Sequence, residues 1–359
     1  MLLPAALPLP QPRTRRRLIL PGLIALLAAS AILAAALGGV PLPPLEIAAL
    51  LASKAGIALP VETTQEHTAI FFAIRLPRVV LGVLVGSGLG MAGAAMQGVF
   101  RNPLADPGLL GISSGGALGA VAAIVLGAHW AQAIAPWISA PHMLPVAAFL
   151  GALGAAWLVE RLARVEGRIV VSMFLLAGIA VAALCAALTG LLTFTATDAQ
   201  LRTILFWTLG SLGGATWKTV LATALFLAAP VALLPRFARA LNALLLGESE
   251  ARNLGVAADR VKKVTTVLIA LAVGTSVAVS GVVGFIGLIV PHVVRLTAGP
   301  DHRVLLPGSA LLGASLVLWA DALARTAVLP AELPLGIVTA SVGAPCFIAL
   351  LVRERGRLG

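Results

Sequence analysis

Long apolar runs separated by short polar segments dominate the chain, and they predict membrane-spanning helices. Each run of about 20 residues rich in Ala, Leu, Val and Gly is long enough to cross the hydrocarbon core of a bilayer. A barrel would instead show segments of about ten residues with alternating polarity. The predicted spans are 18–37, 69–99, 110–127, 144–164, 169–194, 216–235, 262–285, 287–298, 304–325 and 335–352. We therefore expect an all-α polytopic membrane protein with about ten transmembrane helices, some of them short or broken.

Two of these runs leave an alternative open. Residues 18–37 could be a secretory signal, but Gly38-Gly39-Val40-Pro41 is a poor cleavage site, so an uncleaved first span is expected. The run 287–298 is short and contains Pro291, so taken alone it could be re-entrant. The expected organisation is a disordered tail over 1–17, one transmembrane domain over 18–352 with a long loop at 236–263, and a tail over 353–359.

Composition and charge agree with this picture and orient it. The chain is 60% hydrophobic and 11% charged, with a mean hydropathy of +1.04, which is too apolar for a soluble domain. The net charge of +11 could suggest nucleic acid or anionic lipid. However, roughly 19 of the 25 Lys and Arg fall on one predicted side, as the positive-inside rule expects of cytoplasmic loops. Both termini and the 236–263 loop are then cytoplasmic, membrane lipid is an expected partner, and nucleic acid is not.

No catalytic or metal-binding motif stands out in the sequence. It has no G-x-x-x-x-G-K-[ST] phosphate loop, H-E-x-x-H or G-x-S-x-G, so neither ATP hydrolysis nor covalent catalysis is expected. Cys185 and Cys346 lie in apolar runs, as small buried hydrophobic residues do. No metal-ligand spacing joins the histidines, which are His67, His129, His142, His292 and His302. We expect no permanently bound metal or cofactor.

The stretch from Ile74 to Ala120 organises the rest of the chain. Small residues recur at every fourth position of a predicted helix and form one stripe: Gly82, Gly86, Gly90, Ala94 and Gly98. Such a stripe lets a second helix approach closely, although a chain with 37 Gly can produce it by chance. The segment RNPLADPG follows as a turn, because prolines stop the helix and Asn102, Asp106 and Gly108 suit a turn.

Several long motifs give the chain a family resemblance. RLPR, MQG, NPLADPGLLG, SSGGALGA, LNALLLGESEARNLGV, SGVVGFIGLIVPHVVR, ADALAR and ELPLGIVTASVGAPCF occur in this order after about residue 70. They resemble the FecCD family, the permease subunits of type II ATP-binding-cassette (ABC) importers for ferric siderophores, haem and cobalamin. The resemblance implies a homodimer in a bacterial inner membrane, two cytoplasmic ATP-binding subunits that use ATP, and a periplasmic substrate-binding protein. It also implies alternating access, with the fifth and tenth helices lining the pathway.

The long 236–263 loop is the only long cytoplasmic segment that could engage an ATP-driven partner. An apolar LxxLLL start precedes charged residues and a glycine that suits a helix stop. In the resembling family this is the segment that contacts the ATPase, whereas a helix lying on the membrane surface is the alternative. The coupling residues that the resemblance implies are Leu241, Asn242, Leu245, Gly247, Glu248, Glu250, Arg252 and Gly255.

Six basic residues on the predicted outer side depart from the general charge bias. In the resembling family, arginines at the positions of Arg75, Arg78 and Arg325 face acidic residues of the binding protein. The alternative for all three is snorkelling at a helix end. For Arg325, a further alternative is an ion pair with Asp321, which lies four residues earlier.

Substrate contacts are the least determined part of the sequence. Arg202 could bind a carboxylate such as a haem propionate, or could pair with Asp198 on the same helix. The small residues Thr339, Ser341 and Gly343 fit a smooth pathway wall. PGLLGISSG and FWTLGSLGG resemble haem permeases most, which makes haem the expected substrate and leaves ferric siderophore and cobalamin as alternatives.

Two other classes of membrane protein remain as rivals. An ion-driven secondary transporter usually needs an acidic residue within the membrane, and the only candidate is Asp321, which Arg325 could neutralise. The long 236–263 loop has no purpose in that class. A structural or receptor protein without transport is disfavoured because broken, glycine-rich helices make poor static scaffolds.

Overall fold

The computed structural model describes residues 13–57, 59–134, 140–165 and 168–358, and these ranges are almost wholly helical. The helices are α1 (Arg13–Ala36), α2 (Pro44–Lys54), α3 (Gln65–Ala69), α4 (Leu76–Phe100), α5 (Ile112–Ile134), α6 (Ala140–Leu162), α7 (Val171–Phe194), α8 (Asp198–Leu209), α9 (Trp217–Leu233), α10 (Ala238–Leu245), α11 (Glu248–Asn253), α12 (Ala258–Ser280), α13 (Ile286–Ala298), α14 (His302–Thr326) and α15 (Leu335–Leu358). Two-residue strands, β1 (Arg164–Val165) and β2 (Arg168–Ile169), pair antiparallel beyond α6. The all-α fold class is confirmed.

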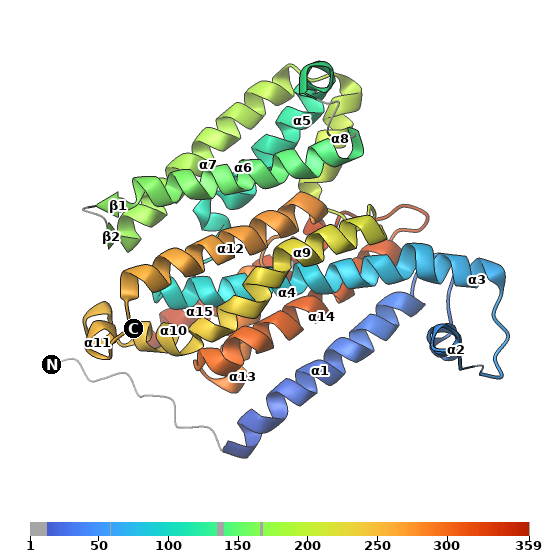
Figure 1. Cartoon of the computed structure of the whole chain (residues 1–359), viewed down its shortest axis with the longest axis horizontal. Coiled ribbons are helices and arrows are strands. Elements are labelled where there is room, and N and C mark those ends of the chain that lie inside the picture. The colour runs from blue at the N-terminus through green and yellow to red at the C-terminus, as the bar shows by residue number, and fades with distance from the viewer. Residues whose placement is uncertain (1–12, 58, 135–139, 166–167, 359) are drawn as a thin grey trace.

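Seven helices within the described ranges are long and apolar enough to cross a membrane. Three shorter apolar helices, at Ile112–Gly127, Ile286–Ala298 and Leu335–Ala349, occupy the remaining predicted spans. The short run around Pro291 forms α13, which at 13 residues is about 20 Å long and too short to cross a bilayer alone. The start of α1, the pair α10–α11 and the end of α15 all lie at one end of the bundle (Figure 1).

The first and last helices extend past the ends of the predicted transmembrane domain. Residues 13–17 continue α1 rather than belonging to a tail, because nothing in RTRRR breaks a helix that the apolar run propagates. The rest of the expected N-terminal tail, 1–12, lies outside the described residues. At the other end, α15 continues to Leu358 instead of stopping at 352.

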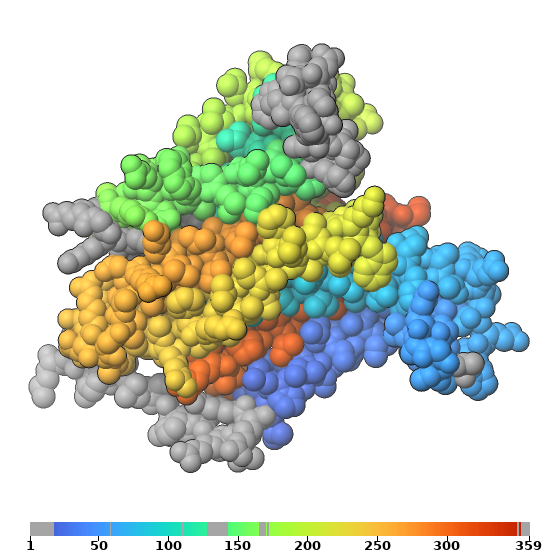
Figure 2. Space-filling model, in the orientation of Figure 1, coloured from blue at the N-terminus to red at the C-terminus, as the bar shows by residue number. Residues whose placement is uncertain are grey.

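The helices form two layers that meet along α12. A central group contains α1, α4, α9, α12, α13, α14 and α15, and a second group contains α5 to α8 (Figure 1). The surfaces of α6 and α12 adjoin on the face that Figure 2 shows. The apolar core is continuous across both groups and includes Leu81 of α4, Val159 of α6 and Ile269 of α12.

The small-residue stripe of α4 is the contact surface of the central group. A Cβ atom on Gly86 or Gly90 would collide with the backbone of α14 at Gly313 and Ser309, and one on Gly82 would lie 3.0 Å from the Cδ2 atom of Leu318. The predicted close helix contact is confirmed. Without methyl groups at these positions the two backbones touch, which is how transmembrane helices gain packing energy in the absence of a hydrophobic drive between them.

Helix ends follow the local chemistry of the sequence. Four helices begin after a polar residue whose side chain accepts a hydrogen bond from a backbone N–H of the first turn, namely Thr64, Thr197, Thr216 and Asp301. The predicted turn after α4 is also present. Its side chains accept backbone hydrogen bonds at 2.9 Å (Leu104 N to Asn102 Oδ1) and 2.7 Å (Gly108 N to Asp106 Oδ1).

Candidate functional site

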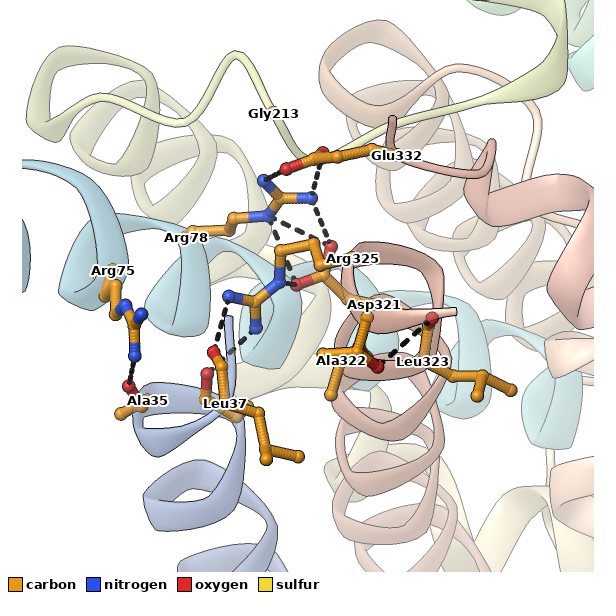
Figure 3. Close-up of polar contacts among 12 residues, drawn as sticks. Ala35, Leu37, Arg75, Arg78, Gly213, Asp321, Ala322, Leu323, Arg325 and Glu332 are labelled. Carbon is orange, nitrogen blue, oxygen red and sulfur yellow. Dashed lines mark hydrogen bonds and ion pairs between the residues drawn. The ribbon is translucent and has the colours of Figure 1, made fainter. Parts of the chain in front are cut away.

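A cluster of charged side chains closes the end of the bundle opposite α10–α11. We call Arg75, Arg78, Asp321, Arg325 and Glu332 the arginine cluster. The Arg78 guanidinium lies between two carboxylates (Figure 3). It donates to Asp321 from Nε at 3.0 Å and from Nη2 at 2.9 Å, and to Glu332 from Nη1 at 3.0 Å and from Nη2 at 2.8 Å. This fork geometry joins α4, α14 and the loop before α15.

The other two arginines of the cluster hold the end of α1. Arg325 donates to the carbonyl oxygens of Leu37 at 3.1 Å and Ala34 at 2.8 Å, and its Nε lies 3.0 Å from Asp321 Oδ2. Arg75 donates to the carbonyls of Ala36, at 2.8 Å, and of Ala35 and Val40. The last carbonyls of a helix have no partner within it and carry partial negative charge, so guanidinium groups stabilise this end of α1.

All three predicted docking arginines are buried within the single chain. Arg75, Arg78 and Arg325 are only 4%, 8% and 7% exposed, because each guanidinium is used within the chain. The intrahelical Asp321–Arg325 pair, which the spacing offered as an alternative, is present. A role for these three arginines in docking a binding protein stays a prediction.

Glu332 is the member of the cluster that the sequence analysis missed. Its side chain is 46% exposed, so it is the part of the cluster that reaches solvent. Hydrogen bonds from Arg78 hold the pKa of Glu332 below its ordinary value, and desolvation opposes this only in part. No local pattern marks Glu332, because its partner lies 254 residues away in sequence.

At the opposite end, the predicted coupling loop folds into the two short helices α10 and α11. Gly247, with a φ of 117°, separates them, and Gly255, with a φ of 79°, ends α11. Both glycines adopt backbone conformations that other residues rarely reach. The segment is therefore a bent pair of short helices and not one continuous helix.

Asn242 fastens α10 to the start of α14. Its Nδ2 donates to Asp301 Oδ1 at 2.7 Å, and its Oδ1 accepts from His302 N at 2.9 Å and Nδ1 at 2.8 Å. Leu241, with no exposed surface, packs into the core beside it. Leu241 is therefore enclosed by the chain, whereas Asn242 is partly buried and uses its amide group to hold two helices together.

Glu248 fastens α11 to the start of α12, as Asn242 fastens α10 to the start of α14. Its Oε1 forms an ion pair with Lys262, whose side chain is 2% exposed, and lies 4.0 Å from Nη2 of Arg101. Ala251, the buried residue of α11, packs against the core. The pair α10–α11 is thus attached to α12 and α14, so a force on it would reach both helices.

The outward face of α10–α11 combines apolar and charged side chains. Leu246 and Leu254 are 67% and 64% exposed, more than the predicted Leu245 at 40%. Glu250 and Arg252 are also exposed, and Arg252 pairs with Asp259 at 3.2 Å. Exposed leucines beside charged side chains suit a surface that faces either a partner protein or the membrane interface.

Three non-helical segments meet beside the arginine cluster, where α8 and α12 end and α15 begins. A Cβ on Gly210 would lie 2.9 Å from the carbonyl oxygen of Val282, and one on Gly336 would lie 3.0 Å from the same atom. Backbone hydrogen bonds link the segments, from Ser211 N to Ser280 O and from Leu335 N to Gly210 O, both 2.9 Å. Irregular backbone inside a membrane protein is tolerated where protein surrounds it or where it lines a cavity.

The predicted pathway residues of α15 do not share one face. Thr339 and Gly343 lie one turn apart and line an apolar pocket of about 260 Å³ between α13, α14 and α15. A Cβ on Gly343 would lie 2.5 Å from the Cβ atom of Phe285. Ser341 is exposed on the other side, because two residues turn a helix by about 200°. Within the single chain Ser341 therefore faces away from Thr339 and Gly343, and the pathway role of all three stays a prediction.

Arg202 stands on the exposed surface of α8 without a partner among the described residues. The predicted alternative, an ion pair with Asp198, does not form in the described structure, where both side chains are exposed. A capping box between Thr197 and Gln200 fixes the start of α8, and Gln200 Nε2 donates to Ile124 O at 3.0 Å. Arg202 is therefore free to bind an anion at a fixed helix.

Histidine and cysteine side chains form no metal centre in the part of the chain that the structure describes, where no three His, Cys, Asp or Glu residues gather as ligands would. His302 is engaged by Asn242, and His67 by Glu46 at 2.7 Å. His129 and His142 are among the residues whose side chains are not described.

Comparison with known structures places this architecture among the membrane-spanning permeases of ABC importers. The chain matches an inward-facing metal-chelate type ABC transporter with a TM-score of 0.79 and 31% identity, covering 94% of this chain and 99% of the other. Residues 26–353 match the FecCD transport family, and the chain belongs to that family. The predicted family is thus confirmed, and the chain is a transport subunit of a type II ABC importer, a class in which a separate subunit hydrolyses ATP.

Three curated relatives represent two substrate groups. The chain is 49% identical to the hemin transport system permease protein HmuU of Yersinia pestis, over 80% of this chain and 84% of that protein. It is 42% identical to the cobalamin import system permease protein BtuC of Halobacterium salinarum, over 89% and 81%. The vitamin B12 import system permease protein BtuC of Klebsiella pneumoniae is 43% identical, over 79% and 82%.

Proposed function

We propose that this chain is the permease of an importer that moves haem from the periplasm to the cytoplasm. The observation that carries this proposal is the 49% identity to a hemin permease, against 42% and 43% to the two cobalamin permeases compared above. Haem carries two propionate carboxylates, and Arg202, which is exposed and has no partner among the described residues, would bind one of them through two hydrogen bonds. Haem is the substrate in this scheme and not a resident cofactor.

Transport proceeds by alternating access between two copies of the chain. The fifth and tenth spans are α7 and α15, and both expose apolar side chains that include Ile179 at 62% and Val342 at 60%. These faces suit either lipid or a second copy, and we assign part of them to the second copy. The pathway then runs along the exposed Ser341 face of α15, whereas Thr339 and Gly343 support that helix from behind.

Two cytoplasmic ATPase subunits supply the energy through α10–α11. Leu245, Leu246, Leu254, Glu250 and Arg252 form the face that they would cover. Leu241, Asn242 and Glu248 carry the movement into α12 and α14 through the attachments described above. Gly247 and Gly255 give α10–α11 its bent shape. In this scheme some of the predicted coupling residues contact the ATPase, and the others transmit its movement to the membrane-spanning helices.

The periplasmic binding protein docks at the opposite end, around Glu332. Arg75 and Arg325 support this surface by holding α1, and Arg78 is reached only along the edge that it shares with Glu332. An acidic side chain of the binding protein would have to compete with Glu332 for the Arg78 guanidinium. Docking therefore depends on the Arg78–Glu332 ion pair.

Substrate identity is tested by growth. A strain lacking the gene is supplied with haem, a ferric siderophore or cobalamin as its limiting nutrient, with and without the gene restored. Rescue on haem alone supports the proposal. Rescue on cobalamin, the alternative favoured by the 42% match over 318 residues, or on a siderophore would overturn the substrate and leave the importer class intact.

The role of Arg202 is tested in the same strain by Arg202→Gln, with Lys218→Gln as the matched control. Lys218 is also exposed, lies on the predicted outer side and has no partner among the described side chains. Loss of haem-dependent growth in the first variant alone supports carboxylate binding. Equal growth of both variants would show that Arg202 does not contact the substrate.

A further inference from the structure

A basic pocket lies between the end of α6 and the start of α12, where the two layers of the bundle adjoin. It has a volume of about 260 Å³ and is lined by Trp157, Glu160, Arg161, Arg164 and Lys263. The end of α6 and the start of α12 lie at the same end of the bundle as α10–α11 (Figures 1 and 2). Nothing in the transport scheme uses these five residues.

Two of the three cations in this pocket are available to bind a ligand. Arg164 forms an ion pair with Glu160, one turn earlier, which neutralises both. Arg161 and Lys263 are exposed and have neither a hydrogen bond nor an ion pair to a described residue. Among the described side chains the pocket thus has two uncompensated positive charges, contributed by two different helices.

The wall on the membrane side of these cations is apolar and exposed. Trp157 lies one turn before Arg161 on α6 and is 64% exposed, and Val267 lies one turn after Lys263 on α12 and is 50% exposed. Both belong to candidate membrane spans, Met143–Leu162 and Ala258–Ser280. Tryptophan is typical of the boundary between hydrocarbon and headgroups. The pocket therefore lies at that boundary, with charge on the water side and apolar surface on the lipid side.

We propose that this pocket binds an anionic phospholipid. Its phosphate pairs with Arg161 and Lys263, and an acyl chain lies against Trp157 and Val267. A guanidinium can donate two parallel hydrogen bonds to a phosphate, and basic pockets between transmembrane helices suit anionic headgroups. A zwitterionic lipid fits less well, because its own cation would lie against the two free charges.

The bound lipid would join the two layers close to the point where α11 is attached to α12. Lys263 is adjacent in sequence to Lys262, which holds Glu248 of α11. A lipid that fixes this turn of α12 to α6 therefore stabilises the part of the bundle to which α10–α11 is attached. This inference needs only the membrane-spanning fold, so it does not depend on haem as the substrate.

Lipid selectivity of the full chain in nanodiscs tests the proposal. The preference for spin-labelled phosphatidylglycerol over spin-labelled phosphatidylcholine is measured for the native chain and for the double variant Arg161→Gln/Lys263→Gln. The double variant Arg239→Gln/Arg260→Gln is the control, because it removes the same charge from exposed positions at the same end of the bundle. Each cation near a membrane surface changes anionic lipid binding by about fivefold, so loss of the preference is expected in the first variant only.

Several outcomes would overturn the proposal. One is an unchanged preference in Arg161→Gln/Lys263→Gln, and another is an equal loss in both double variants, which would indicate general charge attraction. Competition by inorganic phosphate would point to a free anion instead of a lipid. A shared thermal unfolding midpoint shows that the variants are folded.

A second readout follows the acyl chain. Phosphatidylglycerol brominated close to the headgroup should quench more tryptophan fluorescence in the native chain than in Trp157→Phe. Equal quenching of the two would mean that no lipid chain lies against Trp157.

Discussion

The two ends of the bundle differ in how far their functional side chains are buried. At the arginine cluster, three guanidinium groups and Asp321 are buried and satisfied within the chain, and only Glu332 reaches solvent. At α10–α11, the anchoring groups Asn242 and Glu248 face inward, and an apolar and charged face remains uncovered. The first end fixes helices to one another, and the second presents the face that we propose an ATPase subunit covers. Substitutions should therefore affect mainly stability at the first end and mainly transport at the second.

The largest loss of stability is expected for Asp321→Asn. This change leaves Arg78 and Arg325 without their shared buried carboxylate, and breaking a buried ion pair costs about 3–5 kcal/mol in the free energy of unfolding. Denaturant unfolding of the purified chain measures the loss, with Glu62→Gln as a control because Glu62 is an exposed loop carboxylate. A loss no greater than that of the control would mean that the cluster does not hold α4, α14 and α1 together.

A smaller loss is expected for Asn242→Ala at the other end. The change removes three hydrogen bonds that fasten α10 to the start of α14, which should lower the free energy of unfolding by about 1–3 kcal/mol. Transport should fall further than stability, because α10 no longer moves with α14. Unfolding and transport measured on the same preparation distinguish the two effects. Loss of stability with full transport would contradict a transmitting role for Asn242.

Sequence patterns predicted the spans but missed the arrangement of the arginines, because such patterns report only on residues that are close together in the chain. Hydropathy and helix periodicity are local, so the seven long spans and the stripe of Gly86 and Gly90 could be recognised from neighbouring residues. The Asp321–Arg325 pair could also be anticipated because only one helical turn separates its members. Arg78, in contrast, meets its two carboxylates across 243 and 254 residues, which no local pattern reveals.

The predicted site on α15 stays a prediction, but its residues occupy two faces of the helix. Its residues were grouped by size, whereas helix geometry places Ser341 opposite Thr339 and Gly343. That division could have been derived from the spacing alone. The coupling residues, which the family resemblance implied, could not be divided into contacting and transmitting groups before the burial of Leu241 and the exposure of Leu246 were known.

Glu332→Gln should lower the free energy of unfolding by a small amount that depends on pH. This would separate the partly exposed Glu332 from the buried members of the arginine cluster. The Glu332–Arg78 pair is partly exposed, so its loss should cost only about 0.2–1 kcal/mol at neutral pH. Hydrogen bonding from Arg78 lowers the pKa of Glu332 in the folded state, so the folded chain holds this proton more weakly than the unfolded chain. The stability difference from the native chain should stay constant down to the ordinary glutamate value of 4.5 and shrink below it. A difference that grows on acidification would contradict the pairing.

The smallest effect on stability, with a large effect on transport, is expected for Leu246→Ser. Leu246 is 67% exposed on the outward face of α10–α11, so its replacement should change the free energy of unfolding by less than about 0.5 kcal/mol. If an ATPase subunit covers this face, a serine there removes apolar contact area and should reduce co-purification of the ATPase together with substrate-dependent growth. Leu221→Ser is a suitable control, because Leu221 is 69% exposed but lies on the membrane-spanning helix α9. Normal transport by Leu246→Ser would mean that the uncovered face of α10–α11 is not a partner surface, and the contrast between the two ends would then be one of exposure alone.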